Sequence, residues 1–411
     1  MLLHRGFDGS RSRLRGLALG VVLALALGVA GAGCGDDDAE PEAPPPVEDA
    51  DPQSEPAPDD ADAEEDAAED AAQDDTSADD DTEPAAADDQ PELLWTQALE
   101  DNGGGRIGAF AVDPGGEVVY VAHGPTFVLE LADGTVVGTI EYSYPRVDDL
   151  DVSPDGSLVG AGLGLYGVEL TTPEGGVPPG LEDLEQGIDS DGVRFHGGYD
   201  NRLAFSPDGR HLATGNRDGE VWIWDLDAAD QAASLSVPDP DHLTGLFYHP
   251  SGDLLAAVDF GCRLDVWDLD AEEVVHAVEL GFSSCYQNAP VAFSPDGALL
   301  AAGIREDGVE FTRLWTVEGF EPVLDLDMDV RNFTEVAFSP DSSMLATAAW
   351  RMPATVWDVA SGDVRSALDS GADPDDDERQ PVRVVFTVDG DHVVVGYNDG
   401  SVELWRLPVN G

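Results

Sequence analysis

The 411-residue sequence predicts an all-β domain in which seven similar units of four short strands surround a common axis. Three observations lead to this prediction. A short turn pattern recurs seven times between residues 93 and 411, a Trp-containing strand ending follows the later copies, and apolar and polar residues alternate with period two between them. Such alternation is typical of strands with one buried face. One unit cannot bury both faces, whereas seven packed in a ring can, so we expect a seven-bladed β-propeller.

The recurring turn has a proline at its centre in six of seven copies. Its versions are VDPGG, VSPDG, FSPDG, YHPSG, FSPDG, FSPDS and FTVDG, around Pro114, Pro154, Pro207, Pro250, Pro295, Pro340 and Val388. Proline presets one backbone angle of a turn, and Asp and Gly tolerate the tight positions that follow. The pattern therefore indicates turn geometry rather than a serine nucleophile or a metal site.

The strand ending is the second repeated feature. Trp224, Trp267, Trp357 and Trp405 each lie 17 residues past the proline or its equivalent, and Trp315 lies 20 past it. The turn and the Trp thus keep a nearly fixed distance from each other, and the units repeat every 40 to 53 residues. In both respects residues 93–411 resemble the WD-repeat family. The resemblance implies a ring of blades with a large apolar ring packed between neighbours. The Gly-His dipeptide of typical WD repeats is absent, and blades one and two carry Leu in place of Trp.

The ends of the repeat region predict how the ring closes. The last unit ends soon after Trp405 and is one strand short, while residues 93–99 (LLWTQAL) precede the first unit and belong to no blade. We expect residues 93–99 to complete the last blade, which would remove an open strand edge.

Two segments precede the repeats. Residues 1–33 combine four Arg with an uncharged apolar run and small residues before Cys34, the layout of a secretory signal peptide. The Ala-Gly-Cys ending resembles a bacterial lipobox, which implies a lipid on Cys34; an uncleaved anchor or ordinary cleavage is the alternative. Residues 34–92 hold 26 acidic and no basic residues, which predicts a disordered tether, with an acidic partner-binding tail as the alternative.

The charge balance excludes several functions. The chain has a formal charge of -66, and all 19 of its basic side chains are Arg. Such a chain would be repelled by nucleic acid and by anionic lipid, so its contact with a membrane is expected through the lipid alone. Without Lys, neither Schiff-base catalysis nor a Walker-type phosphate site is possible. We expect no cofactor and no enzyme activity.

Cysteine and carboxylate positions suggest one structural bond and one weak metal site. In the expected propeller, Cys262 and Cys285 fall in two loops on the same face, and an exported chain with Cys34 lipidated would leave them as a pair that can form a disulfide. Asp189 and Asp191, followed by Gly192, are weak calcium candidates because they resemble the start of a calcium loop.

The resemblance also implies that partners bind at the turns between the second and third strands of the blades. Several of these turns carry Trp, Arg, Met or aromatic residues, which are enriched in binding hot spots. The candidate partner-binding residues are Arg217, Phe260, Arg263, Arg305, Trp350, Arg351, Met352 and Tyr397.

These features together predict an exported, membrane-anchored lipoprotein, periplasmic or on the cell surface, whose propeller binds a protein or peptide partner in the cell envelope. Two alternatives stay open. One is a calcium-dependent propeller hydrolase or lyase, and the other is a module that binds a glycan or cell-wall fragment. The oligomeric state does not follow from the sequence.

Overall fold

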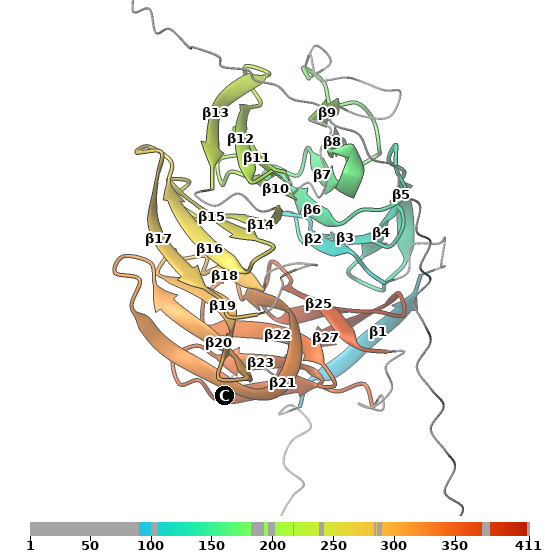
Figure 1. Cartoon of the computed structure of the whole chain (residues 1–411). Coiled ribbons are helices and arrows are strands. Elements are labelled where there is room, and N and C mark those ends of the chain that lie inside the picture. The colour runs from blue at the N-terminus through green and yellow to red at the C-terminus, as the bar shows by residue number, and fades with distance from the viewer. Residues whose placement is uncertain are drawn as a thin grey trace, which may run out of the picture. The chain divides into compact units, whose positions relative to one another are not determined.

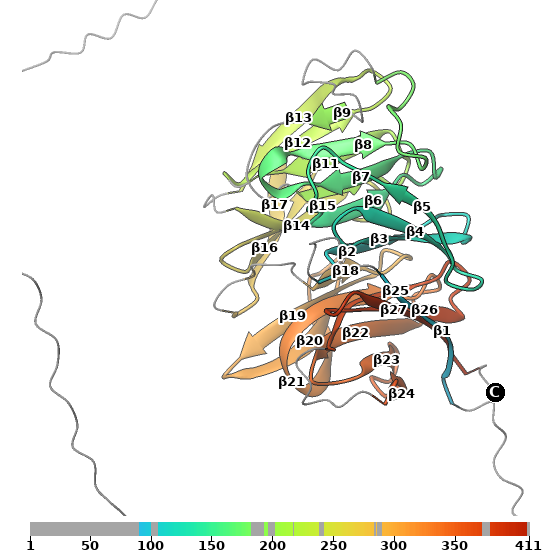
Figure 2. The same cartoon turned by 90° about the vertical axis from the view of Figure 1, so that its right-hand side faces the viewer.

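The computed structural model describes residues 90–99, 106–181, 193–195, 202–216, 218–237, 242–282, 285, 290–371 and 379–408. These residues form seven four-stranded antiparallel blades in a ring, so the predicted seven-bladed β-propeller is confirmed. Figure 1 shows the blades around a centre surrounded by the first strand of each, and Figure 2 shows the ring from the side. The helical element among the described residues is one 3₁₀ turn, η1 (Gly164–Tyr166).

The first four blades follow each other along the chain. Blade one contains β2 (Ala109–Val112), β3 (Val118–Ala122), β4 (Thr126–Glu130) and β5 (Val136–Ile140). Blade two contains β6 (Asp149–Val152), β7 (Val159–Gly162), β8 (Val168–Thr171) and β9 (Val193–Phe195). Blade three contains β10 (Arg202–Phe205), β11 (His211–Gly215), β12 (Glu220–Asp225) and β13 (Asp230–Ser236). Blade four contains β14 (Leu243–Tyr248), β15 (Leu254–Asp259), β16 (Arg263–Asp268) and β17 (Glu273–Glu279).

Blades five and six share one long strand. Blade five contains β18 (Val291–Phe293), β19 (Leu299–Glu306), β20 (Val309–Thr316) and the start of β21 (Pro322–Phe338). Blade six contains the rest of β21, β22 (Met344–Trp350), β23 (Ala354–Asp358) and β24 (Val364–Leu368). The first half of β21 pairs with β20 and the second half with β22, so the strand passes from the outside of one blade to the inside of the next.

The last blade closes the ring as the sequence predicts. It contains β25 (Pro381–Phe386), β26 (His392–Tyr397), β27 (Ser401–Arg406) and β1 (Glu92–Ala98). Strand β1 pairs antiparallel with β27, with Glu92 opposite Arg406 and Ala98 opposite Ser401. Apolar residues of β27 and of blade one, including Val402 and Val119, share one buried cluster, so the closing blade is also packed against the first.

The proline turns link neighbouring blades on one face of the ring, here called the proline-turn face. Gly209 in the turn of blade three has a φ of 70°, and a Cβ there would stand 3.5 Å from Cδ of Pro154 in the turn of blade two. A Cβ on Gly116 of blade one would likewise stand 3.5 Å from Cβ of Val388 in the turn of blade seven. The turns hold themselves together: the Ser206 hydroxyl donates to Asp208 over 2.7 Å and accepts from the His211 amide. This hydroxyl contact lowers the pKa of Asp208, as expected for a structural turn.

The repeated tryptophans lie between the blades, and their indole N–H groups differ in their acceptors. The indole nitrogen of Trp224 donates to the Thr214 hydroxyl over 2.9 Å, and that of Trp357 donates to Thr347 over 3.0 Å. In blade four the same position of β15 holds Ala257, and the buried indole N–H of Trp267 has no acceptor among the described residues. A missing acceptor at a buried donor costs about 1–3 kcal/mol.

We therefore expect Ala257→Thr to raise the free energy of unfolding by about 1 kcal/mol, because Thr supplies the acceptor that two sister blades already contain. Urea unfolding followed by tryptophan fluorescence measures this. Ala257→Val is the matched control, since it adds similar bulk without the hydroxyl. An equal gain in the Val variant would show that packing, not the hydrogen bond, is responsible.

Candidate functional site

The face opposite the proline turns is formed by the turns between second and third strands and by the connections between blades. We call it the loop face. Turns on this face are hydrogen-bonded to the connections between neighbouring blades. The Leu243 amide donates to the Asn216 carbonyl over 3.1 Å, and the Arg305 amide donates to the Leu280 carbonyl over 2.8 Å. The loop face is therefore held in place by backbone hydrogen bonds between blades.

In blade four the predicted residues lie beside the disulfide. Phe260 is half-buried, and its ring centroid lies 4.3 Å from that of His242. Arg263 pairs with the buried Asp265 over 2.9 Å and with Glu279 over 3.5 Å. The hydrogen bond to Asp265 raises the pKa of Arg263. Phe260 is thus partly accessible, while the charge of Arg263 is balanced by two carboxylates.

Cys262 and Cys285 are joined by a disulfide, with Cα atoms 5.2 Å apart. The bond ties the turn after β15 to the connection between β17 and β18. The backbone repeats this link, because the Cys285 amide donates to the Phe260 carbonyl over 3.0 Å. Both half-cystines are buried, so the bond fixes the loop face rather than exposing a reactive sulfur.

Among the predicted residues that the structure describes, those of blades five and six are the most accessible. Arg305 is 42% exposed and stands 4.0 Å from Glu310. Trp350 is half-buried at the end of β22, and Met352 packs against a buried cluster that includes Phe338. Arg351 between them is exposed and has a φ of 66°, a left-handed conformation that usually falls to glycine. Its amide donates to the Gln380 side chain, which holds this turn against blade seven.

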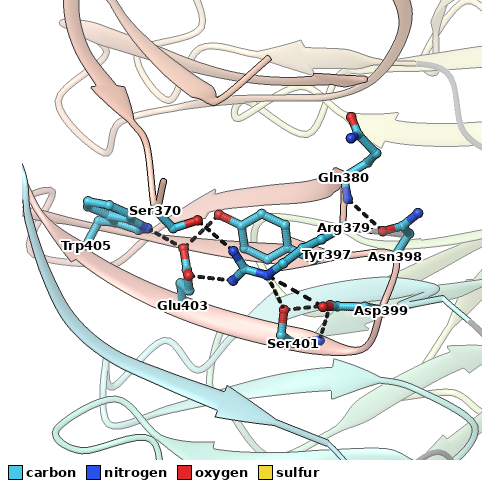
Figure 3. A network of polar contacts seen from close by, with 9 residues as sticks. All are labelled: Ser370, Arg379, Gln380, Tyr397, Asn398, Asp399, Ser401, Glu403 and Trp405. Carbon is cyan, nitrogen blue, oxygen red and sulfur yellow. Dashed lines mark hydrogen bonds and ion pairs between the residues drawn. The ribbon is translucent and has the colours of Figure 1, made fainter. Parts of the chain in front are cut away.

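The prediction that Tyr397 belongs to the partner surface is wrong, because this side chain is only 4% exposed. Figure 3 shows its hydroxyl directed at Glu403 and its ring beside Arg379. The hydroxyl donates to Glu403 over 2.7 Å, and the Arg379 guanidinium lies 4.0 Å above the ring. The Tyr397 side chain is buried together with the Glu403 carboxylate of β27, which accepts its hydrogen bond.

Four other predicted residues cannot be placed on the structure. Arg217, Asp189 and Asp191 lie outside the described residues, as does Cys34. Within the described ranges, no group of three or more His, Cys, Asp or Glu side chains is placed to hold a metal ion. The described residues also include no helix with the length and apolar character needed to cross a bilayer.

A set of charged residues that the sequence analysis missed lies at the centre of the ring. Asp149, Arg202, Glu335 and Arg383 each stand five residues before the central Pro or Val of their repeat, on the first strands of blades two, three, six and seven. The same position holds Ala109, Gly245 and Pro290 in the other blades. We call these seven positions the channel belt. The fixed offset of five residues was visible in the sequence and could have revealed the belt.

Asp149, Glu335 and Arg383 of the belt line a cavity of about 380 Å³. The carboxylate of Asp149 accepts from the Leu203 amide over 3.0 Å, and that of Asp151, two residues further on, accepts from the Phe205 amide over 2.8 Å. Arg383 lies 3.5 Å from Glu335. Burial raises the pKa of Asp151 to about 7 and that of Glu335 to about 7. The Phe205 amide opposes the shift at Asp151, and the charge of Arg383 opposes it at Glu335.

These pKa values predict how stability changes with pH. An acid whose pKa is higher in the folded than in the unfolded chain stabilises the fold at low pH, and this contribution is lost as pH rises through about 7. We expect the free energy of unfolding to fall between pH 5 and pH 8, and to fall less in Asp151→Asn. Urea unfolding at both pH values measures the difference. Asp155→Asn is the control, because the pKa of Asp155 in its proline turn is lowered and its effect lies below this window. A wild-type slope equal to that of the Asp151 variant would contradict the assignment.

The comparisons with known proteins agree with this architecture. Residues 196–225 match the family model described as WD domain, G-beta repeat. That stretch covers β10 to β12 of blade three. The chain is 26% identical over 233 residues to the target of rapamycin complex subunit wat1 of Schizosaccharomyces pombe, a match that covers 56% of this chain and 69% of that protein. These findings support a WD-repeat propeller.

Two further relatives match a shorter stretch. One is the cross-pathway control WD-repeat protein 2 of Flammulina velutipes, 29% identical over 128 residues. The other is the small ribosomal subunit protein RACK1 of Schizosaccharomyces pombe, 30% identical over 128 residues. Each match covers 30% of this chain and 39% of the relative's length.

Proposed function

We propose that the chain is a non-catalytic interaction scaffold of the WD-repeat type, which binds a protein or peptide partner on its loop face. The observation that carries the proposal is the turn of blade six. There Trp350 is half-buried, Arg351 is exposed in a left-handed conformation, and Gln380 fastens the turn to blade seven. Holding a non-glycine residue in this conformation costs about 1–2 kcal/mol, and such strain is common at functional sites.

Two further observations support the proposal. The printed names of two relatives describe a subunit of a complex and a ribosomal subunit protein, so those proteins work inside assemblies. Blade-to-blade hydrogen bonds hold the loop face in shape before a partner arrives, which lowers the entropy cost of binding.

The location in the cell is a second part of the proposal. We propose an exported lipoprotein, cut before Cys34, lipidated there and tethered by residues 34–92 in the cell envelope, periplasmic or at the surface. The Cys262–Cys285 disulfide supports an oxidising compartment, where such bonds persist. The sequence pattern of residues 1–34 is the other support.

The test is capture of partners by the full-length chain in native membranes, with a C-terminal tag, crosslinking and mass spectrometry. We expect a reproducible protein partner whose yield falls at least about tenfold in Trp350→Ala, the loss expected when a hot-spot side chain is truncated. The matched control is Val388→Ala, which removes a 49%-exposed apolar side chain from the proline-turn face. Equal loss in both variants, or none in either, would overturn the assignment of the loop face.

A further inference from the structure

We propose that the loop-face mouth of the central channel binds one anionic oxygen group, a carboxylate or a phosphate, carried by the partner. The inference rests on the proposed function, because the mouth lies on the loop face, and it adds the chemistry that the partner must present. Four arginines gather there from separate parts of the chain. They are Arg106 before β2, Arg146 before β6, Arg202 at the start of β10 and Arg383 in β25.

Backbone contacts bring these arginines together. A Cβ on Gly108 would stand only 2.2 Å from the Val147 carbonyl oxygen, so the segment after Arg106 lies directly against the segment after Arg146. The Arg383 guanidinium donates to the Gly108 carbonyl over 2.9 Å. Arg202 donates to the Asp148 carbonyl over 2.7 Å. The four side chains therefore surround one small region where blades seven, one, two and three begin.

Among the described residues, the acceptors at the mouth do not satisfy every donor of Arg106 and Arg202. Asp148 pairs with Arg146 over 2.7 Å, Glu335 lies beside Arg383, and Asp149 interacts electrostatically with Arg202 and Arg383. Arg202 is only 5% exposed, and its Nε has no hydrogen-bond acceptor in the part of the chain that the structure describes. Arg106 forms no hydrogen bond or ion pair with any residue that the structure describes. Donors in a planar fork that lack acceptors match the paired oxygens of a carboxylate or phosphate.

The electrostatic environment agrees with an anion. Burial, together with the positive charges of Arg383 and Arg146, lowers the pKa of Arg106 to about 10, and the negative charge of Asp148 opposes this shift. An anion placed among them would relieve this repulsion. Residues 93–411 hold 58 acidic residues against 15 Arg, so the surrounding surface repels polyanions. The site therefore fits a single anionic group rather than nucleic acid.

Arg379 of blade seven shows what a purely structural arginine looks like in this protein. Its guanidinium donates to Glu403 over 2.5 Å and to Ser370 over 2.6 Å, and it lies 3.5 Å from Asp399 (Figure 3). All three nitrogens thus have protein partners, in contrast to Arg106. The contrast separates an arginine that stabilises the fold from one that is available to a ligand.

The experiment titrates the purified full-length chain with inorganic phosphate and, separately, with acetate, at constant ionic strength set by chloride. Binding is followed by calorimetry and by the rise in melting temperature that a ligand of the folded state causes. We expect saturable binding of at least one anion and an affinity at least about tenfold lower in Arg106→Gln. Arg210→Gln, on the exposed proline-turn face, is the control and should bind as the wild type does.

Binding of phosphate alone would assign a phosphate group to the partner, and binding of acetate alone would assign a carboxylate. Absence of saturable binding by both anions, or wild-type affinity in Arg106→Gln, would overturn the site. Partner capture with the same variants separates this from the proposed function. Anion binding that Arg106→Gln abolishes, with capture unaffected by Trp350→Ala, would contradict the loop-face assignment around blade six and leave the anion site standing.

Discussion

Replacing Arg379 by alanine should lower the free energy of unfolding by about 3–5 kcal/mol, the usual cost of breaking a buried ion pair. The carboxylate of Glu403, 1% exposed, accepts from Arg379 over 2.5 Å, from Tyr397 over 2.7 Å and from Trp405 over 3.0 Å. Without Arg379 it would remain buried with neutral donors alone. Urea unfolding of the single variants measures the loss. Adding Glu403→Gln to Arg379→Ala should recover part of it, because the uncompensated charge is then gone.

The matched control is Arg406→Ala on the same strand, β27. Arg406 pairs with Glu92 over 3.0 Å, but both side chains are about half or more exposed. Exposed pairs contribute about 0–1 kcal/mol, so this variant should unfold nearly as the wild type does. A loss in Arg379→Ala as small as that in Arg406→Ala would show that the network of Figure 3 does not stabilise the closing blade.

Breaking the Cys262–Cys285 disulfide should lower the free energy of unfolding by about 3 kcal/mol. The bond closes a loop with a sequence separation of 23, and the chain-entropy relation gives this magnitude for such a loop. The measurement is urea unfolding of the wild type with and without a reductant, with reduction verified by mass spectrometry. The same loss is expected in the Cys262→Ala, Cys285→Ala double variant.

The double variant also provides the control for the reductant. Its stability should be the same with and without reductant, because the third cysteine of the chain, Cys34, precedes the described residues of the propeller. A wild type that is fully reduced and equally stable would contradict the structural importance of the bond.

The fold could be predicted from the sequence because the information is repeated. The turn pattern recurs in every blade and the Trp strand ending in most of them, so a copy that departs from the pattern can still be recognised from its spacing to the others. Closure by β1 followed from counting strands, and the structure confirms it. The shared strand β21 could not be foreseen, since the pattern does not show that residues 322–338 pass from one blade to the next without a break.

The site was harder to predict, for a physical reason. The residue types of the loops point to a partner surface, and Arg305, Trp350 and Arg351 do lie on one face. Asp149, Arg202, Glu335 and Arg383 lie in or next to strands, where charged residues are usually read as part of the solvent-exposed side, so their position at the centre became evident only from the closed ring. Only closure turns these positions toward a shared axis. For Tyr397 the difficulty is the reverse. Its turn has the sequence of an exposed turn, but the side chain is buried and its hydroxyl donates to Glu403.

The central claim is that the loop face, and not the proline-turn face, contacts a protein partner. The most direct measurement places a photo-crosslinking amino acid at position 351 or at position 388 in the full-length chain, in native membranes. Both positions are exposed, and they lie on opposite faces. We predict a specific protein adduct from position 351 and none from position 388. The same adduct from both positions, or an adduct from position 388 alone, would contradict the account.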